Sequence, residues 1–209
     1  MNLFYNLIAK MYDLMLSIYF TKEETNPRNA VAKLINDNDK NLLEVCAGTC
    51  GNSITIAKHN TKMQITATDM SSGMLDVARK NISKNNISNI DLKVMDATNL
   101  KLDDKSFDVA VISLALHEMD ETTQQKILLE VRRVLKDTGK FIVVEWDKNS
   151  SKTIGQKIKF AFIDLFEPKS YKILMKQEMN KYFGNVGFEI SETILCDYTK
   201  LYKLRKHHE

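Results

Sequence analysis

The sequence is poor in the residues that interrupt regular structure. Only 2 prolines and 7 glycines occur among its 209 residues, which argues against long disordered linkers. It also lacks internal repeats and low-complexity tracts. A chain of this length can build one α/β domain with its own core and is too short for two ordinary domains. We therefore expect a single domain over residues 1–209.

Cysteines and secretory features are scarce as well. The sequence has 3 cysteines, an odd and small number that is typical of a reducing compartment. The apolar stretch 1–20 lacks a basic leading region and a small-residue cleavage site. Lys10 and Asp13 lie inside that stretch and argue against a membrane span. We expect a cytoplasmic protein.

The sequence has little excess of either charge, because 30 basic residues are balanced by 27 acidic ones for a formal net charge of +3. This balance does not argue for a nucleic-acid partner. Apolar residues make up 44% and charged residues 27%, which is an ordinary globular balance.

Periodic apolar positions predict helices first and then alternating strands and helices. A helix is expected over 2–19, and a second begins after Asn26, the expected N-cap, and runs to about Asn36. Short β-branched or apolar runs then predict five strands, at 42–46, 64–69, 90–95, 107–114 and 140–145. Helical stretches lie between them at 51–59, 72–84 and 121–135. This alternation predicts parallel strands covered on both faces.

The pattern changes after Glu145. Residues 153–180 are expected to be largely helical with an interruption at Pro168. Two further strands, at about 187–192 and 194–203, should pair as an antiparallel hairpin because little separates them. The predicted fold class is α/β, a Rossmann-like, doubly wound, seven-stranded and mostly parallel sheet that ends in an antiparallel hairpin. Its expected parts are N-terminal helices, a core of alternating strands and helices, a helical insertion and the hairpin, at 1–38, 40–146, 147–182 and 183–204.

The first turn after a strand carries the first chemical signal. The run Glu44-Val45-Cys46-Ala47-Gly48-Thr49-Cys50-Gly51 places small residues where a strand turns into a helix, so that a ligand can approach the backbone. The G-x-G-x-x-G fingerprint of dinucleotide-binding folds is absent. The run resembles the first motif of class I S-adenosylmethionine-dependent methyltransferases (families 11 and 25), with cysteine where two glycines are usual. The resemblance assigns Glu44, Cys46, Ala47 and Gly48 to cofactor binding.

Two further strand ends fit the same family in register. Asp69 ends the second strand and can accept both hydroxyls of a ribose. The string that follows it resembles the family pattern, which brings Met70 and Met74 to the cofactor. In similar proteins an acid after the third strand accepts the exocyclic amine of adenine, and the next backbone amide meets the ring. That role falls to Asp96 and Ala97.

The fourth strand should border the same crevice, because ligands of open α/β sheets bind outside the carboxyl ends of the strands. Ser113 and Leu114 are expected beside the methionine part of the cofactor. His117 is the candidate catalytic residue, since histidine titrates near neutrality and could orient the acceptor or take its proton. The alternative is a hydrogen-bonded surface or cap histidine. Before the fifth strand, Asp137-Thr138-Gly139 is expected to replace the family's usual turn.

The methyl acceptor is expected to be small and apolar, such as a quinone precursor or a lipid. The resemblance covers about residues 40–146, and residues 4–13 are loosely similar to the start of quinone-biosynthesis methyltransferases. Tyr5, Tyr12 and Trp146 are the expected substrate-binding residues, with the two tyrosines as a lid. Other aromatic residues accompany them at both ends of the chain: Phe4, Tyr19, Phe160, Phe162 and Phe166. These aromatics could instead simply pack against the sheet.

Lysines beside apolar residues would also suit a peripheral contact with an anionic membrane: Lys152, Lys157 and Lys159 beside Ile154, Ile158 and Phe162.

The expected activity is methyl transfer from S-adenosylmethionine, and this chemistry requires no metal. Cys46 and Cys50 are small packing residues rather than metal ligands, because one pair is not a site. Two alternatives remain open, a non-catalytic interaction module and a nicotinamide-dependent oxidoreductase. The sequence leaves open the atom that is methylated and the oligomeric state.

Overall fold

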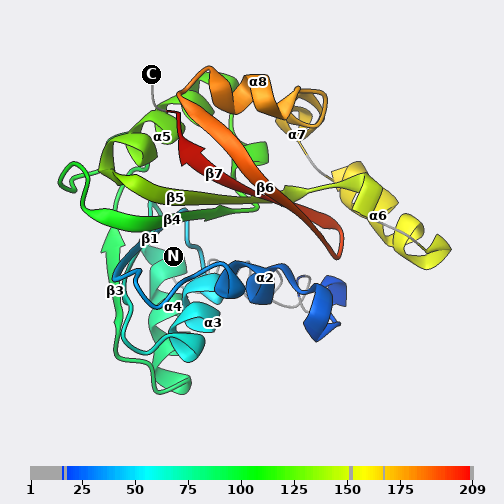
Figure 1. Ribbon diagram of the computed structural model, residues 1–209. Coiled ribbons are helices and arrows are strands. Elements are labelled where there is room, and N and C mark those ends of the chain that lie inside the picture. The colour runs from blue at the N-terminus through cyan, green and yellow to red at the C-terminus, as the bar shows by residue number, and fades with distance from the viewer. Residues whose placement is uncertain (1–15, 17, 151–152, 167, 208–209) are drawn as a thin grey trace.

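A mostly parallel β-sheet flanked by helices forms the body of the protein in the computed structural model, which describes residues 16, 18–150, 153–166 and 168–207 (Figure 1). The strands lie in the order β3-β2-β1-β4-β5-β7-β6. Their bounds are β1 Asn41–Val45, β2 Gln64–Asp69, β3 Ile90–Val94, β4 Phe107–Ser113, β5 Leu135–Trp146, β6 Phe188–Cys196 and β7 Thr199–Lys206. β7 runs antiparallel to both of its neighbours, β5 and β6, whereas the other strand pairs described here are parallel. The predicted fold class is confirmed.

Helices connect the parallel strands and cover both faces of the sheet. Their bounds are α2 Pro27–Lys33, α3 Gly51–His59, α4 Ser72–Lys84, α5 Glu121–Val134, α6 Ile154–Phe166, α7 Lys169–Leu174 and α8 Met179–Gly184. Single 3₁₀ turns lie at η1 Glu23–Thr25, η2 Leu116–Glu118 and η3 Lys148–Ser150. Asn26 caps α2 as predicted, because its side chain accepts from the Arg28 N–H at 2.9 Å.

Alternate residues of the central strands build two separate apolar layers. On one face Leu42 and Val109 pack beneath α2 and α3, and on the other Leu43 and Phe141 pack against α5 and α8. Strands that are buried on both faces need continuous apolar runs, which explains why the sequence signal for them is strong. Within this sheet β1 pairs with β2 on one side and with β4 on the other. The strand order therefore reverses at β1, where open α/β sheets form their ligand crevice.

Two predicted boundaries are wrong. Asp137-Thr138-Gly139 lies inside β5 rather than in a turn, because the register jumps from Phe107–Leu135 to Val109–Lys140 and leaves a bulge. The terminal hairpin turns at Asp197-Tyr198 rather than near residue 193. Asp197 accepts a 2.6 Å hydrogen bond from the Thr25 hydroxyl and donates its N–H to the Thr25 carbonyl at 2.9 Å. These contacts fix the turn at that place.

The helices of the segment after β5 follow the prediction, with a break at Pro168, which precedes α7. The segment is more divided than expected, into α6, α7 and α8. The helix predicted over 2–19 lies outside the described residues except at positions 16, 18 and 19, which are helical. Within the described ranges, no helix is long and apolar enough to cross a membrane.

Candidate active site

A cavity of about 460 Å³ opens at the carboxyl ends of β1, β2 and β4. The structure brings together in its wall every position predicted to contact the cofactor: Glu44, Cys46, Ala47, Gly48, Asp69, Met70, Met74, Asp96, Ala97, Ser113 and Leu114. The N-terminal region adds Leu16, Phe20 and Arg28 to the wall, and the turn after β4 adds Glu118 and Met119. The sequence signals for these five residues are weak because they lie outside the strand-end motifs.

The turn after β1 uses an unusual backbone conformation at every second residue. Cys46, Gly48 and Cys50 have φ angles of 53°, 53° and 62°. These are the three alternating positions at which the resemblance expects glycine, the residue that reaches positive φ without steric cost. The Ala47 N–H donates to the Thr68 carbonyl at 2.9 Å, and the Cys50 N–H donates to the Ala47 carbonyl at 2.8 Å. The two cysteines therefore keep the shape of the turn.

Glu44 lies beneath that turn with 2% of its surface exposed. Its carboxylate accepts from the Asn52 amide and the Ser53 N–H, each at 3.0 Å, and from the Ser53 hydroxyl. Burial raises the pKa of Glu44, while these hydrogen bonds oppose the rise. Both donors lie in the first turn of α3, so the carboxylate also faces the positive end of that helix.

Asp69 presents a carboxylate that the backbone holds by both oxygens. One oxygen accepts from the Gly48 N–H and the other from the Ser71 N–H, each at 2.8 Å. A carboxylate oxygen has two lone pairs, so each oxygen can accept one more hydrogen bond. The two remaining positions match the spacing of two neighbouring hydroxyls on a sugar ring.

Beyond Asp69 the cavity wall contains the carboxylate of Asp96 and the apolar side chains of Met70 and Ala97. One oxygen of Asp96 accepts from both the N–H and the hydroxyl of Thr98 at 2.8 Å, and these bonds lower the pKa of Asp96. The ionised carboxylate can then accept a hydrogen bond from an amine. Met70 is 75% exposed at the rim, and Ala97 is 7% exposed in the wall. Such an arrangement suits a flat heterocycle that carries an exocyclic amine.

Glu118 is a titratable group in the cavity wall that the sequence interpretation passed over. Glu118 belongs to η2, which closely follows β4, and the residue as a whole is exposed at the rim although neighbouring protein groups surround its carboxyl. Burial of the carboxyl raises the pKa of Glu118, and the negative charges of Glu145 and Asp69 raise it further against the opposing effect of His117. A carboxylate with a raised pKa is a better proton acceptor.

His117 and Trp146, in contrast, lie outside the set of described residues that line the cavity. His117 is 2% exposed, and its Nδ1 lies 2.5 Å from Glu145 Oε2. The other oxygen of Glu145 accepts from the Leu116 N–H at 2.9 Å. The 3₁₀ turn therefore directs the imidazole inward to β5 while Glu118 faces the cavity.

Trp146 is 2% exposed and belongs to an apolar cluster with Phe20, Leu114 and Tyr198. Its ring centroid lies 6.2 Å from that of Phe20, which itself lines the cavity. The Trp146 Nε1 is buried and has no hydrogen-bond partner among the described residues. Tyr5 and Tyr12, the predicted lid, lie outside the described residues.

The chain is similar to known methyltransferases. Residues 42–139 match the family described as "Methyltransferase domain". Demethylmenaquinone methyltransferase of Thermotoga maritima is 29% identical over 165 residues, which are 78% of this chain and 69% of that protein. The enzyme of the same name from Listeria monocytogenes is 31% identical over 140 residues, 66% of this chain. The match covers 58% of the Listeria protein, less than two thirds of its length.

A solved structure has the same fold at low sequence identity. The crystal structure of a SAM dependent methyltransferase from Aquifex aeolicus superposes with a TM-score of 0.68 at 17% identity, over 87% of this chain and 90% of that one. The matched family segment runs from β1 to the bulge in β5, and it contains most of the cavity wall. Residues 42–139 of the chain therefore form a methyltransferase domain.

Proposed function

We propose that this chain transfers a methyl group from S-adenosylmethionine to a small apolar acceptor of the quinone-precursor type. The observation that carries the proposal is the single cavity at the switch point of the sheet, whose wall contains the complete predicted set of cofactor residues. When bound, the cofactor supplies a sulfonium whose methyl group is already activated for transfer. The protein then mainly has to hold donor and acceptor in line.

Each part of the cavity is assigned to one part of the cofactor. Asp69 binds the ribose hydroxyls with its two open lone pairs. Asp96 accepts from the adenine amine, with Met70 and Ala97 against the ring. The remaining positions hold the methionine end and the turn beside it: Glu44, Cys46, Ala47, Gly48, Met74, Ser113 and Leu114. Glu44 lies beneath the turn at that end, where Asn52 and Ser53 hold its carboxyl by hydrogen bonds.

Glu118 is assigned as the general base, which takes the proton when the acceptor has to lose one. A general base must come within hydrogen-bond reach of the reacting group, and the Glu118 carboxyl lies in the cavity wall. His117 was the expected catalytic residue, but its imidazole is buried against Glu145. We therefore propose that His117 contributes by fixing the turn that presents Glu118.

The acceptor is proposed to enter beside Leu114. Leu16, Phe20 and Leu114 line this part of the cavity and pack against Trp146. The names of the two demethylmenaquinone methyltransferase relatives support a quinone-type acceptor. Trp146 packs against these side chains but lies outside the described residues that line the cavity, so its substrate-binding role stays a prediction. The lid role of Tyr5 and Tyr12, and the boundaries at 1–38 and 147–182, stay predictions.

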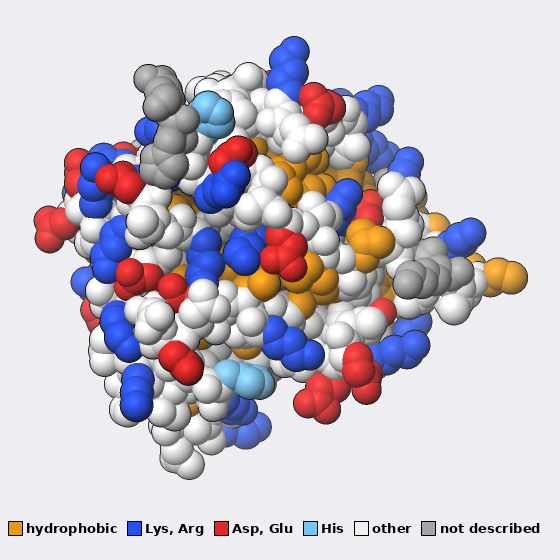
Figure 2. All heavy atoms as spheres, in the orientation of Figure 1, with side chains coloured by type: hydrophobic (Ala, Val, Ile, Leu, Met, Phe, Trp, Pro, Cys, Tyr) orange, Lys and Arg blue, Asp and Glu red, His pale blue; other side chains and the backbone are white. Residues whose placement is uncertain are grey.

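A peripheral membrane contact through α6 is part of the same proposal. Ile154, Ile158 and Leu165 are 78%, 57% and 73% exposed. At 100° per residue their positions fall within about 40° of one another on the helix, and the buried Phe160 lies on the opposite side. In Figure 1 α6 projects from the body of the protein, and Figure 2 shows apolar atoms at that end. Lys157 and Lys159 would suit an anionic, cytoplasmic membrane surface.

The deciding experiment is calorimetric titration with S-adenosylmethionine and, separately, with NAD. We expect micromolar binding of S-adenosylmethionine alone, with the affinity of Asp69→Ala at least tenfold lower. Asp69→Asn is the matched control for shape, because it keeps the side-chain volume and loses one acceptor oxygen. Binding of NAD alone would favour the oxidoreductase, and binding of neither would favour the interaction module.

The acceptor class needs a separate assay. Purified protein with labelled S-adenosylmethionine should methylate a demethylated naphthoquinol with an apolar tail and leave a polar catechol unmethylated. Labelling of the catechol at the same rate would contradict the apolar acceptor while it leaves the methyl transfer itself intact.

A further inference from the structure

The loop between β3 and β4 carries part of the cofactor wall without a helix or strand of its own. Residues 95–106 contain Met95, Asp96, Ala97 and Thr98, all of which line the cavity. Loops without regular structure are the more mobile parts of a fold. A binding wall on such a loop must therefore be held from outside, and the contacts of α5 show how.

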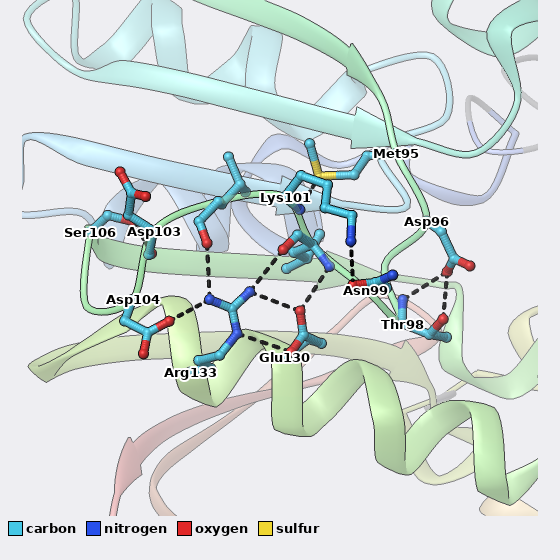
Figure 3. Close-up of polar contacts among 12 residues, drawn as sticks. Met95, Asp96, Thr98, Asn99, Lys101, Asp103, Asp104, Ser106, Glu130 and Arg133 are labelled. Atoms are coloured by element: carbon cyan, nitrogen blue, oxygen red, sulfur yellow. Dashed lines mark hydrogen bonds and ion pairs between the residues drawn. The ribbon is translucent and has the colours of Figure 1, made fainter.

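Arg133, near the end of α5, holds the middle of this loop with its guanidinium (Figure 3). Its Nη2 donates to the Leu100 carbonyl at 2.8 Å, and its Nη1 donates to the Leu102 carbonyl at 2.9 Å and to the Asp104 carboxylate at 2.5 Å. The Arg133 carbonyl also accepts from the Lys105 N–H at 3.0 Å. One residue thus contacts the loop at four positions.

Glu130, one turn earlier on α5, completes the arrangement. Its carboxylate accepts from Arg133 Nε at 3.0 Å and Nη2 at 2.9 Å, and from the Leu100 N–H at 2.8 Å. Leu100 is 3% exposed, so both of its backbone groups would otherwise be left in the core. The hydrogen bonds with Arg133 hold the pKa of Glu130 below its ordinary value, so the pair stays charged at neutral pH.

The clamped part of the loop is joined to the cavity wall by short local contacts. The Asn99 N–H donates to the Asp96 carbonyl at 3.1 Å, and the Lys101 N–H lies 3.4 Å from the Met95 sulfur. Asp96 itself is tied to Thr98. Figure 3 shows Arg133 and Glu130 on one side of the loop and Asp96 at its far end. A shift at residues 100–104 would therefore move the carboxylate that faces the ligand.

We propose that Arg133, together with Glu130, is a positioning residue for the adenine end of the cofactor. Neither side chain is among the described residues that line the cavity, so both act through the loop. The inference rests on the proposed placement of adenine at Asp96. Loss of the Arg133 clamp should weaken cofactor binding and leave the acceptor side and the transfer step unchanged.

The experiment compares Arg133→Met and Arg133→Lys with Arg132→Met as the matched control. Arg132 is the neighbouring arginine of α5 and donates to the Gly187 carbonyl, away from the loop. We expect Arg133→Met to raise the Kd and KM for S-adenosylmethionine about tenfold or more, because several charge-assisted hydrogen bonds are lost. The kcat at saturating cofactor and the KM for the acceptor should stay within about twofold of wild type, a margin well below tenfold. Arg133→Lys should recover part of the affinity.

A second readout reports on Asp96 directly. Wild type should prefer S-adenosylhomocysteine over S-inosylhomocysteine, which has an oxygen in place of the adenine amine. Arg133→Met should reduce that preference, whereas Arg132→Met should keep it. If Arg133→Met does not fold, Arg133→Lys serves in its place, because a single ammonium cannot make the contacts with Leu100, Leu102 and Asp104 together.

The outcomes separate the two proposals. Unchanged cofactor affinity in Arg133→Met, or in Arg133→Lys where Arg133→Met does not fold, with wild type binding normally, overturns the clamp and leaves the cofactor site intact. A fall in kcat at unchanged KM for the cofactor overturns it as well. Wild type that binds no S-adenosylmethionine would remove the proposed function, and the clamp with it.

Discussion

At the scale of single residues, the turn after β1 shows that conformation rather than residue type is required there. Cys46, Gly48 and Cys50 share a positive φ, although a residue with a Cβ pays about 1–2 kcal/mol in that region. Burial and the charge of Asp69 raise the pKa of Cys46 to about 12. The Cys46 thiol therefore stays neutral, and the side chain serves as a small apolar residue.

Cys46→Gly should stabilise the protein by about 0.5–1 kcal/mol, because relief of the positive-φ strain exceeds the extra entropy that glycine gives the unfolded chain. Cys46 is only partly buried, so little packing is lost. Urea denaturation of wild type and variant measures the difference. Cys50→Gly is the contrasting control, since Cys50 is 0% exposed and its loss leaves a cavity. A destabilised Cys46→Gly would show that the side chain packs better than its exposure suggests.

Glu118→Gln tests the assignment of the base. Glu118 acts as a base only when it is ionised, so kcat should rise with pH through its pKa, which lies above the ordinary 4.5. We expect Glu118→Gln to lower kcat about 10²-fold or more and to flatten the acidic limb of the pH profile. The Kd for S-adenosylmethionine should change little. A variant with wild-type kcat and the same acidic limb would exclude Glu118 as the base.

At the scale of elements, the apolar runs of the central strands were predictable and the polar ends were not. The positions of β1, β2, β3 and β4 were predicted closely, because strands that are buried in the sheet need largely apolar sequence, whereas β5 begins earlier than expected, at Leu135. Residues 191–193 looked like a turn because they are polar, yet they are the exposed part of β6 at the sheet edge. Asp137 was expected in a turn as well, but it pairs with Lys105 beside the bulge, next to the pair of Lys136 with Asp108.

The candidate site divides in the same way. Asp69 and Asp96 follow strands, so the strand pattern alone brings them to one edge of the sheet. His117 follows a strand too, but the 3₁₀ turn at Leu116–Glu118 directs it to Glu145, a partner 28 positions away. No local pattern in the sequence records that pairing. Because His117 is turned toward Glu145, Glu118 rather than His117 reaches the cavity.

Glu145→Ala should destabilise the protein by about 3 kcal/mol, because it leaves the buried Leu116 N–H and the His117 imidazole without their carboxylate. Glu145→Gln keeps the shape and an acceptor oxygen, so its loss of stability should be about half as large. Thermal unfolding of both variants gives the comparison. Equal stability of wild type and Glu145→Ala would mean that the contact between His117 and Glu145 does not support the 3₁₀ turn at Leu116–Glu118.

At the scale of the whole molecule, α6 is the part that reaches farthest from the sheet in Figure 1. Its apolar side would meet a bilayer while the cavity stays with the sheet. Such an arrangement would let an apolar acceptor leave the membrane close to the site. The same side chains would otherwise remain in water, which soluble surfaces tolerate singly but seldom as a cluster.

Ile158→Glu should reduce binding to vesicles that contain anionic lipid, because a carboxylate replaces a buried apolar contact and repels the surface. Co-sedimentation with vesicles at low and high salt measures the effect. Lys157→Gln should weaken binding at low salt by about 1 kcal/mol. Lys58→Gln on α3 is the control, since it lies on another helix. Wild type that does not bind anionic vesicles at low salt would refute the membrane contact.

The strand order also has a consequence for how the protein is made. β7 follows β6 in the chain but lies between β5 and β6 in the sheet. A chain that grows from its N-terminus therefore exposes the unpaired edge of β5, with Phe141 and Val143 beside it, until β7 has left the ribosome. A chain whose synthesis stalls before Thr199 would keep the edge of β5 free to pair with a strand of another chain. Pairing of the 8 residues of β7 with β5 and β6 closes that edge, so a chain without β7 should be prone to aggregate through β5.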